Sequence, residues 1–148
     1  MRVVIQRVTS ARVDVDGETV GSIGAGILAL LGIAAADGEA DADWLLDKMI
    51  DLRIFQNADG KFDRSLRETG GELLVVSQFT LLANTRKGRR PSFSDAARPE
   101  HAVPIYEYFT AQARARGVPT ATGRFGASMQ VELVNDGPVT IILDSGER

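Results

Sequence analysis

The tetrapeptide Ser77-Gln78-Phe79-Thr80 contains residue types that could act on a carbonyl group, and it lies within an apolar run that begins at Glu72. In an extended strand, Ser77 and Phe79 would lie on one face and Gln78 and Thr80 on the other. Backbone amides that are freed where a strand ends can stabilise a developing oxyanion. The motif therefore indicates either a catalytic site or polar side chains that are satisfied within a sheet.

A second candidate is the run Asn135-Asp136-Gly137-Pro138-Val139-Thr140. Asn, Asp, Gly and Pro in succession are typical of a turn between two strands, and an ordinary turn is one interpretation. The functional alternative requires a cis Gly-Pro bond, which is uncommon in folded proteins and usually kept for a reason. Such a bond would turn two carbonyl oxygens in one direction and make a rigid backbone acceptor.

A third candidate is the segment from Thr85 to Arg90, in which Arg86, Lys87, Arg89 and Arg90 are cationic although the whole chain carries a net charge of -3. A charge run is usually a solvated loop. The alternative is a patch that contacts phosphates, which Arg7, Arg98 and Arg124 would extend. Because the net charge is negative, any contact with RNA has to come from such a patch.

The composition excludes several kinds of site. The chain has no cysteine, which excludes disulfides, thiolate metal centres and a cysteine nucleophile. Its one histidine, His101, excludes sites that need two imidazoles, and no carboxylate stands at motif spacing from it. We interpret His101 as structural or exposed. Gly24-Ala25-Gly26 and Gly70-Gly71 match no phosphate-binding spacing. We therefore expect no metal and no cofactor.

No segment resembles a signal peptide or a membrane span. The first apolar run ends at Gln6, and the weakly polar stretch from Ile23 to Ala36 is shorter than the ~20 residues that a bilayer requires. We expect no contact with a membrane. The lack of cysteine is consistent with a reducing, cytoplasmic location.

Two hydrophobic periods predict the secondary structure. Alternating or continuous apolar runs predict strands, and the period of Leu45, Met49 and Leu52 predicts a helix with Asp41 or Asp43 as its N-cap. The predicted strands are residues 2–8, 11–15, 19–23, 26–32, 72–82, 129–134 and 139–143, and the predicted helices are residues 42–53 and a stripe from Pro99 that ends near Gly117, with Pro104 in its first turn.

The remaining segments are predicted to be loops. Asn57 to Gly60 has turn residues, residues 62–71 form mostly loop, and residues 83–98 form a long surface loop. The helices are too few and too late for a doubly wound parallel sheet. With 148 residues, we expect one α+β domain spanning residues 1–148, with a curved, mostly antiparallel sheet or open barrel and two helices packed on it.

Taken together, these motifs closely resemble the D-aminoacyl-tRNA deacylases, also called D-tyrosyl-tRNA deacylases. The resemblance extends from the first predicted strand to the last and is carried by Ile5-Gln6-Arg7-Val8, Gly24-Ala25-Gly26, Arg53-Ile54-Phe55, Val75 to Leu81, Arg90-Pro91-Ser92-Phe93-Ser94, Thr122-Gly123-Arg124-Phe125, Met129-Gln130-Val131 and Asn135 to Thr140.

The resemblance implies a homodimeric carboxylic ester hydrolase of the cytoplasm. It would cleave the ester that joins a D-amino acid to the 3′ end of tRNA and spare the L form, with glycyl-tRNA mischarged on tRNA-Ala as a second substrate. The active site would lie at the subunit interface, where residues 77–80 of one subunit face Gly137-Pro138 of the other. The peptide bond before Pro138 would be cis.

Site residues follow from the motifs and the resemblance. We expect Ser77, Gln78, Phe79 and Thr80 to be catalytic, Gly137, Pro138, Met129 and Arg7 to bind substrate, and Arg86, Lys87, Arg89 and Arg90 to bind the tRNA acceptor stem.

Water is the favoured nucleophile in this reaction. An aminoacyl ester is already activated, so oriented water and backbone amides can suffice. Thr80 as nucleophile would lack the base it requires. Two rival hypotheses are a non-catalytic tRNA-binding dimer and a structural assembly protein.

Overall fold

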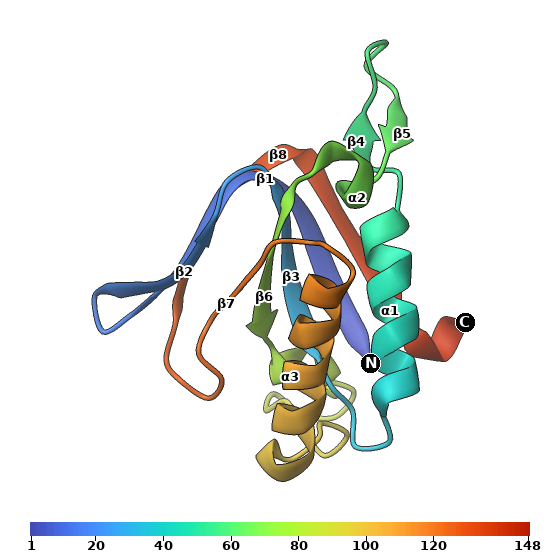
Figure 1. Ribbon diagram of the computed structural model, residues 1–148. Coiled ribbons are helices and arrows are strands. Elements are labelled where there is room, and N and C mark those ends of the chain that lie inside the picture. Colours follow the sequence, from blue (N-terminus) through green and yellow to red (C-terminus); the bar gives the residue numbers. More distant parts are fainter.

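Strand β1 (Arg2–Val15) organises the sheet because three other strands pair with it, all antiparallel. Its first half pairs with β3 (Gly26–Gly32), its second half with β2 (Glu18–Ile23), and almost its whole length with β8 (Gln130–Asp144). Figure 1, the computed structural model of residues 1–148, shows β1 and β8 bending together over the top of the molecule. The two halves of β1 therefore belong to different walls of one curled sheet.

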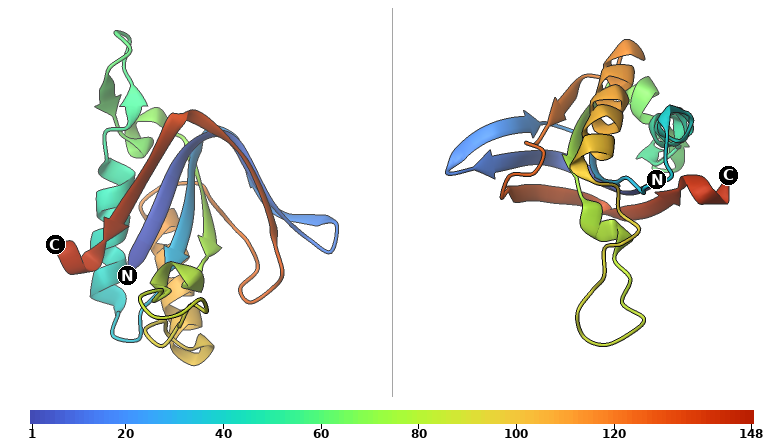
Figure 2. Two further views of the ribbon diagram at one scale, coloured as in Figure 1. Left: turned by 180° about the vertical axis from the view of Figure 1, so that it is seen from behind. Right: turned by 90° about the horizontal axis from the view of Figure 1, so that it is seen from below.

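Two parallel pairings complete the sheet. Strand β6 (Glu72–Ser77) lies beside β3, and β7 (Thr120–Thr122) lies beside β6. The sheet is thus mixed, and its walls curl into a nearly closed barrel whose remaining seam lies between β2 and β7 (Figure 2). At that seam Gly21 approaches the Thr122 carbonyl so closely that a Cβ atom on Gly21 would lie 2.2 Å from the oxygen. The predicted α+β class with a curved sheet or open barrel is confirmed.

The alternation of buried side chains along β1 separates two hydrophobic clusters. Val3 and Ile5 point to one face, where helices α1 (Glu39–Asp51) and α3 (Pro99–Ala115) cover the sheet. Ala11, Val13 and Val15 point into the curl of the barrel, where they meet Leu28, Leu74 and Val76. The odd-numbered residues thus face the helices in the first half of β1 and the barrel interior in the second half. The face that they point to changes where the pairing with β8 is irregular, between Val8 and Ser10. Each half of β1 therefore buries its apolar side.

Both predicted helices are present, with corrections at their starts. Helix α1 begins after Gly38, and the Asp41 carboxylate accepts a hydrogen bond from the Gly38 amide at 2.9 Å, so Asp41 lies in the first turn and is not the N-cap. Helix α3 begins at Pro99, which places Pro104 in the second turn, not the first. Gly117, with φ +83°, follows the last residues of α3 as predicted and accommodates the left-handed exit. None of the helices is long and apolar enough to cross a membrane.

Four other predictions need correction. Residues 2–8 and 11–15 are one strand, β1, and residues 129–134 and 139–143 are one strand, β8. The predicted loop 62–71 contains the short strand β5 (Phe62–Arg64), paired with β4 (Phe55–Gln56), and the short helix α2 (Leu66–Thr69). The predicted strand 72–82 ends at Ser77 and continues as the 3₁₀ turn η1 (Phe79–Leu82). A further 3₁₀ turn, η2 (Ser145–Glu147), ends the chain.

Candidate active site

Strand β6 ends at Ser77 because its neighbour β3 ends at Gly32 and offers no further partner. The Gln78 amide makes the last contact, donating to the Leu31 carbonyl at 2.8 Å, and the chain then turns into η1. The alternation of side chains predicted for a strand therefore stops at Ser77. The turn leaves the Phe79 ring 54% exposed at the protein surface.

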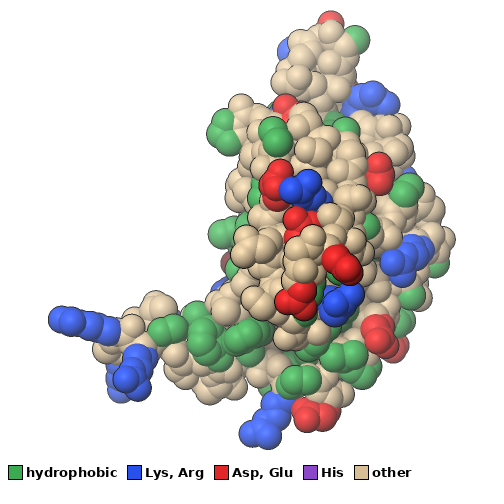
Figure 3. All heavy atoms as spheres, turned by 90° about the vertical axis from the view of Figure 1, so that its left-hand side faces the viewer, with side chains coloured by type: hydrophobic (Ala, Val, Ile, Leu, Met, Phe, Trp, Pro, Cys, Tyr) green, Lys and Arg blue, Asp and Glu red, His purple; other side chains and the backbone are tan.

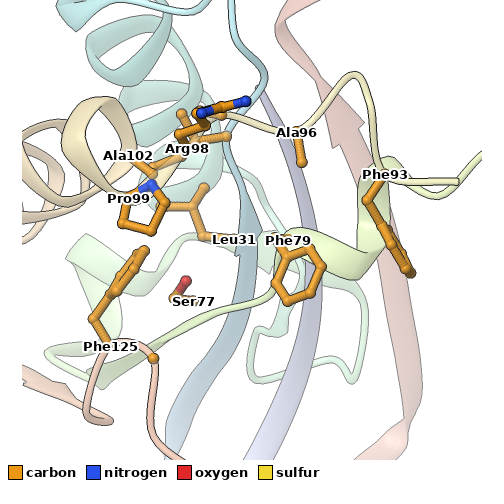
Figure 4. A pocket seen from close by; sticks show the side chains of 12 residues that line it. Leu31, Ser77, Phe79, Phe93, Ala96, Arg98, Pro99, Ala102 and Phe125 are labelled. Carbon is orange, nitrogen blue, oxygen red and sulfur yellow. The ribbon is translucent and has the colours of Figure 1, made fainter.

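Two adjoining cavities open beside Phe79, and Ser77, Phe79, Phe125 and Gly126 line both of them. The larger has a volume of about 380 Å³ and is mostly apolar; its wall includes Leu31, Phe93 and Pro99. In Figure 4, Ser77 lies between Phe79 and Phe125 in this cavity. The smaller cavity, about 280 Å³, contains Gln78 and Met129. Three of the four predicted catalytic residues and Met129 thus line one composite groove.

The groove offers hydrogen-bond donors but no imidazole. The Gln78 side-chain amide donates to the Thr80 hydroxyl. The amides of Phe79 and Thr80 begin the turn, and amides in that position have no acceptor within a helical turn. His101 is engaged elsewhere, with its Nε2 2.7 Å from the Asp37 carbonyl oxygen. No three acidic or histidine side chains are placed to hold a metal ion.

Tyr106 supports the floor of the groove from below. Its hydroxyl donates to the Val75 carbonyl at 2.8 Å, and its ring meets Phe125 edge-on at 5.8 Å between centroids. Burial raises the pKa of Tyr106 to about 12, so its phenol stays protonated. Since Phe125 lines both cavities, Tyr106 fixes one wall of the groove without contacting its interior.

The second motif is a bulge inside β8. Gln6 pairs with Thr140 and Val8 with Asn135, so residues 136–139 stand opposite Arg7 alone. Asn135 closes the bulge: its side-chain oxygen accepts from the Val139 amide at 2.8 Å. The Gly137-Pro138 bond is cis, and both residues are exposed. Of the two interpretations, the ordinary turn between two strands is wrong, because β1 continues to pair with β8 on both sides, and the cis bond that the alternative requires is present.

Arg7 connects this bulge to the start of the β4–β5 hairpin. Its guanidinium is buried and donates to the Asp136 carbonyl at 2.8 Å and to the Ile54 carbonyl at 2.7 Å. The Phe62 ring covers it, with 5.4 Å between the guanidinium carbon and the ring centroid. Arg7 therefore holds the backbone of the bulge from inside the protein.

Within one chain, the bulge and the groove are far apart. Across the sheet, Ser77 pairs with Leu31, which in turn pairs with Val3 of β1. The bulge stands opposite Arg7, four residues further along β1. Four residues span about 13 Å along a strand, and three strand spacings across the sheet add about 14 Å in the perpendicular direction. The structure brings Met129 to the predicted catalytic residues but leaves Gly137 and Pro138 away from them.

The four predicted RNA-binding cations lie on a loop that projects from the body of the protein. Asn84 and Ser92 exchange two backbone hydrogen bonds, of 2.7 and 2.9 Å, and so close the base of the loop. The side chains of residues 86–90 are exposed. Figure 3 shows blue side chains without red ones on the projection at lower left, next to an apolar area.

Phe93, Arg98 and Phe125 also line the larger cavity. Phe93 and Phe125 stand in motifs that carry the family resemblance, and Arg98 was expected to extend the basic patch, but none of the three was predicted to be a site residue. Phe93 meets Phe79 edge-on with 5.0 Å between ring centroids, although it belongs to the predicted surface loop. Aromatic residues within polar, basic loops were the available signal for Phe93 and Phe125, because such side chains usually need a partner.

Solved structures share this architecture over nearly the whole chain. One, described as "c-Myc DNA Unwinding Element Binding Protein", is 41% identical with a TM-score of 0.91, covering 97% of this chain and 98% of that one. A second, "Structural Analysis of a probable eukaryotic D-amino acid tRNA deacylase", has a TM-score of 0.84 at 18% identity over 96% and 97%, and it shows the fold alone. The nearly closed barrel with few helices is thus an established fold.

Relatives at higher identity define the family. The family model for D-Tyr-tRNA(Tyr) deacylase matches residues 4–144. A D-aminoacyl-tRNA deacylase from Roseiflexus sp. is 60% identical over 98% of this chain and 94% of the relative, and one from Thermus aquaticus is 56% identical over 100% and 97%. The chain belongs to the D-Tyr-tRNA(Tyr) deacylase family and is an ester hydrolase, as its motifs predicted.

Proposed function

We propose that this protein hydrolyses the ester bond between a D-amino acid and the terminal adenosine of tRNA, releasing the free D-amino acid and the tRNA in the cytoplasm. Residues 1–148 act as one deacylase domain, and glycyl-tRNA mischarged on tRNA-Ala is a further substrate. The observation that carries the proposal is the match in shape and chemistry between two separate features. One is a concave, aromatic-lined groove at residues 77–80, and the other is a protruding bulge at Gly137-Pro138.

A second copy of the chain completes the active site. The groove and the bulge are separated along the sheet, so one chain cannot place both on the same substrate. Between them on β8 lie the exposed residues Thr140 and Ile142, the latter 65% exposed. In a two-fold dimer, this exposed patch of one subunit would contact the same patch of the other. Each groove would then face the bulge of the partner, which gives two such sites per dimer. This supports a homodimer in which residues 77–80 of one subunit face Gly137-Pro138 of the other.

The bulge selects the hand of the amino acid. Main-chain carbonyl oxygens at Gly137 and Pro138 accept hydrogen bonds from the substrate ammonium group and occupy the direction that an L side chain would need. Discrimination then comes from a steric clash against the L form. Glycine passes because it has no side chain to clash. Arg7 contributes to substrate binding by holding the Asp136 carbonyl, and with it the bulge, in place.

Hydrolysis uses water and backbone amides. The amides at Phe79 and Thr80 stabilise the oxyanion that develops when water attacks the ester carbonyl, an effect that typically contributes a few kcal/mol per donor. Gln78 orients the Thr80 hydroxyl, and Met129 and Phe79 exclude bulk water from the carbonyl carbon. Thr80 does not act as nucleophile because the only imidazole, that of His101, is bound at Asp37.

The tRNA approaches along the basic loop. Arg86, Lys87, Arg89 and Arg90 are exposed, and none of them forms an ion pair within the chain. They are free to bind phosphates of the acceptor stem, which gives a salt-dependent affinity.

A stereochemical assay tests the proposal. Purified protein is incubated with one tRNA charged with either the D or the L form of the same amino acid, and the release of free amino acid is followed. We expect rapid hydrolysis of the D form only. Equal rates for both forms would refute the chiral selection. Binding without turnover of either form would favour the alternative, a non-catalytic tRNA-binding dimer.

A further inference from the structure

Arg98 lies at the rim of the larger cavity, next to the first turn of α3. In Figure 4 it stands above Ser77, while Phe125 stands across the cavity from Phe79. Arg124 directly precedes Phe125 in the chain, and its side chain is exposed. Arg98 is therefore a cation at a cavity whose wall is otherwise mostly apolar, and Arg124 is an exposed cation next to the wall residue Phe125 in the chain.

Neither arginine is neutralised within the chain. Ion pairs engage seven other arginines, at positions 2, 7, 12, 53, 67, 116 and 148, but neither Arg98 nor Arg124 forms an ion pair or a side-chain hydrogen bond. The carboxylates nearest to Arg98 in sequence, Asp95 and Glu100, form no ion pair with it. In a chain of net charge -3, both arginines are therefore cations without an internal partner.

We propose that Arg98, which lines the cavity, and Arg124, which directly precedes the wall residue Phe125, bind the phosphates just before the terminal nucleotide of the RNA strand. This inference rests on the proposed function and assigns the two arginines a task that differs from that of the loop. The three aromatic rings of Phe79, Phe93 and Phe125 suit a stacked base. Arginine beside such a surface can hold a phosphate through two parallel hydrogen bonds. The loop cations contact the stem further away.

Substrates of increasing length separate the two groups of cations. D-aminoacyl-adenosine has no phosphate, a D-aminoacyl trinucleotide has the phosphates next to the terminal nucleotide, and D-aminoacyl-tRNA has the whole stem. The variants are Arg98→Gln and Arg124→Gln, with Lys48→Gln as the control, because Lys48 is an exposed, unpaired cation on α1. Rates are measured on all three substrates, and affinity for the uncharged trinucleotide is measured by fluorescence anisotropy at several salt concentrations.

The expected pattern is specific to the phosphates. Each arginine variant lowers kcat/KM about tenfold on the trinucleotide and on tRNA, leaves the adenosine ester unchanged, and lowers the salt slope of trinucleotide binding by about one. Lys48→Gln changes none of these. An equal loss on the adenosine ester, or no loss on the trinucleotide, would overturn the inference while the proposed function stands. A wild-type protein that hydrolyses none of the three substrates would overturn the proposed function and, with it, this inference.

Discussion

The turn after β6 and the bulge in β8 are both interruptions of regular strands, but they differ in how the chain fixes them. Residues 77–82 turn because β3 has ended, and the turn leaves a concave groove with aromatic walls. Residues 136–139 bulge outward although β1 runs past them without a break, and Asn135 and Arg7 hold the bulge by hydrogen bonds to its backbone. The first region is therefore concave, whereas the second protrudes from the sheet.

The difference explains why the two regions are proposed to work across subunits. In the proposed site, the groove supplies donors that bind the ester and stabilise its oxyanion, and the ammonium group is bound elsewhere. A protruding backbone supplies acceptors but has no cavity of its own. Because the sheet holds them apart within one chain, the geometry favours an arrangement in which each subunit supplies one of the two parts.

The largest expected effect follows from changing the shape of the bulge. A Cβ atom at Gly137 would lie 2.6 Å from the Val139 amide nitrogen, so Gly137→Ala must displace the bulge. A displacement of about 1 Å can cost about 100-fold in rate, and we expect that loss in kcat/KM for D-aminoacyl-tRNA. Gly24→Ala is the control, because its nearest neighbour lies 3.5 Å away. Unchanged activity of Gly137→Ala would show that the bulge is not part of the active site.

The next effect concerns the support of the bulge. Arg7→Gln leaves the carbonyls of Asp136 and Ile54 without their charged donor, and we expect the free energy of unfolding to fall by about 2–4 kcal/mol. Arg12→Gln on the same strand removes a surface ion pair with Glu132 and should cost less than about 1 kcal/mol. Urea unfolding of both variants measures the difference. Equal losses would show that Arg7 is no special support.

A smaller effect is expected at the basic loop. Replacing Arg86, Lys87, Arg89 and Arg90 by Gln should raise KM for tRNA about tenfold and lower its salt dependence, because phosphate contacts are lost. The midpoint of thermal unfolding should not change, since the four side chains are exposed and make no ion pairs. Kinetics at two salt concentrations provide the measurement. An unchanged KM would show that the loop is an ordinary solvated segment that does not bind tRNA.

The smallest effect is expected at Thr80. If water is the nucleophile, Thr80→Ala removes only the hydroxyl that accepts from Gln78, and hydrolysis should remain within about tenfold of the wild type. Single-turnover rates with D-aminoacyl-tRNA test this. Complete loss of hydrolysis in a folded Thr80→Ala protein would support a threonine nucleophile and contradict attack by water.

Local patterns predicted the elements well where neighbours agreed with them. The run Gly26–Gly32 is a buried strand with the predicted limits, and the helical period after Asp41 marks α1. The capping box Ser65-Leu66-Arg67-Glu68 is a local signal for α2 within the predicted loop. The Ser65 hydroxyl accepts from the Glu68 amide at 3.2 Å, and the Glu68 carboxylate accepts from the Ser65 amide at 2.7 Å.

Long-range pairing decided what local patterns could not. The residues of the bulge have turn chemistry, and only the register of β1 against β8 shows that the strand continues beyond them. The apolar residues Leu81 and Leu82 favour a longer β6, but β3 ends too early to pair with them. Motifs thus predicted Ser77, Gln78, Phe79 and Met129, which line the groove, whereas the cavity walls at Phe93 and Phe125 depended on contacts between distant segments.

Subunit complementation tests the central claim most directly. Phe79→Ala damages the groove and Gly137→Ala damages the bulge, and each homodimer should be nearly inactive on D-aminoacyl-tRNA. If the site is shared, mixed and re-equilibrated subunits form heterodimers with one intact groove facing one intact bulge, and about a quarter of the wild-type activity returns. If the mixture stays as inactive as its two components while heterodimers are present, groove and bulge do not meet across subunits, and the proposed site is contradicted.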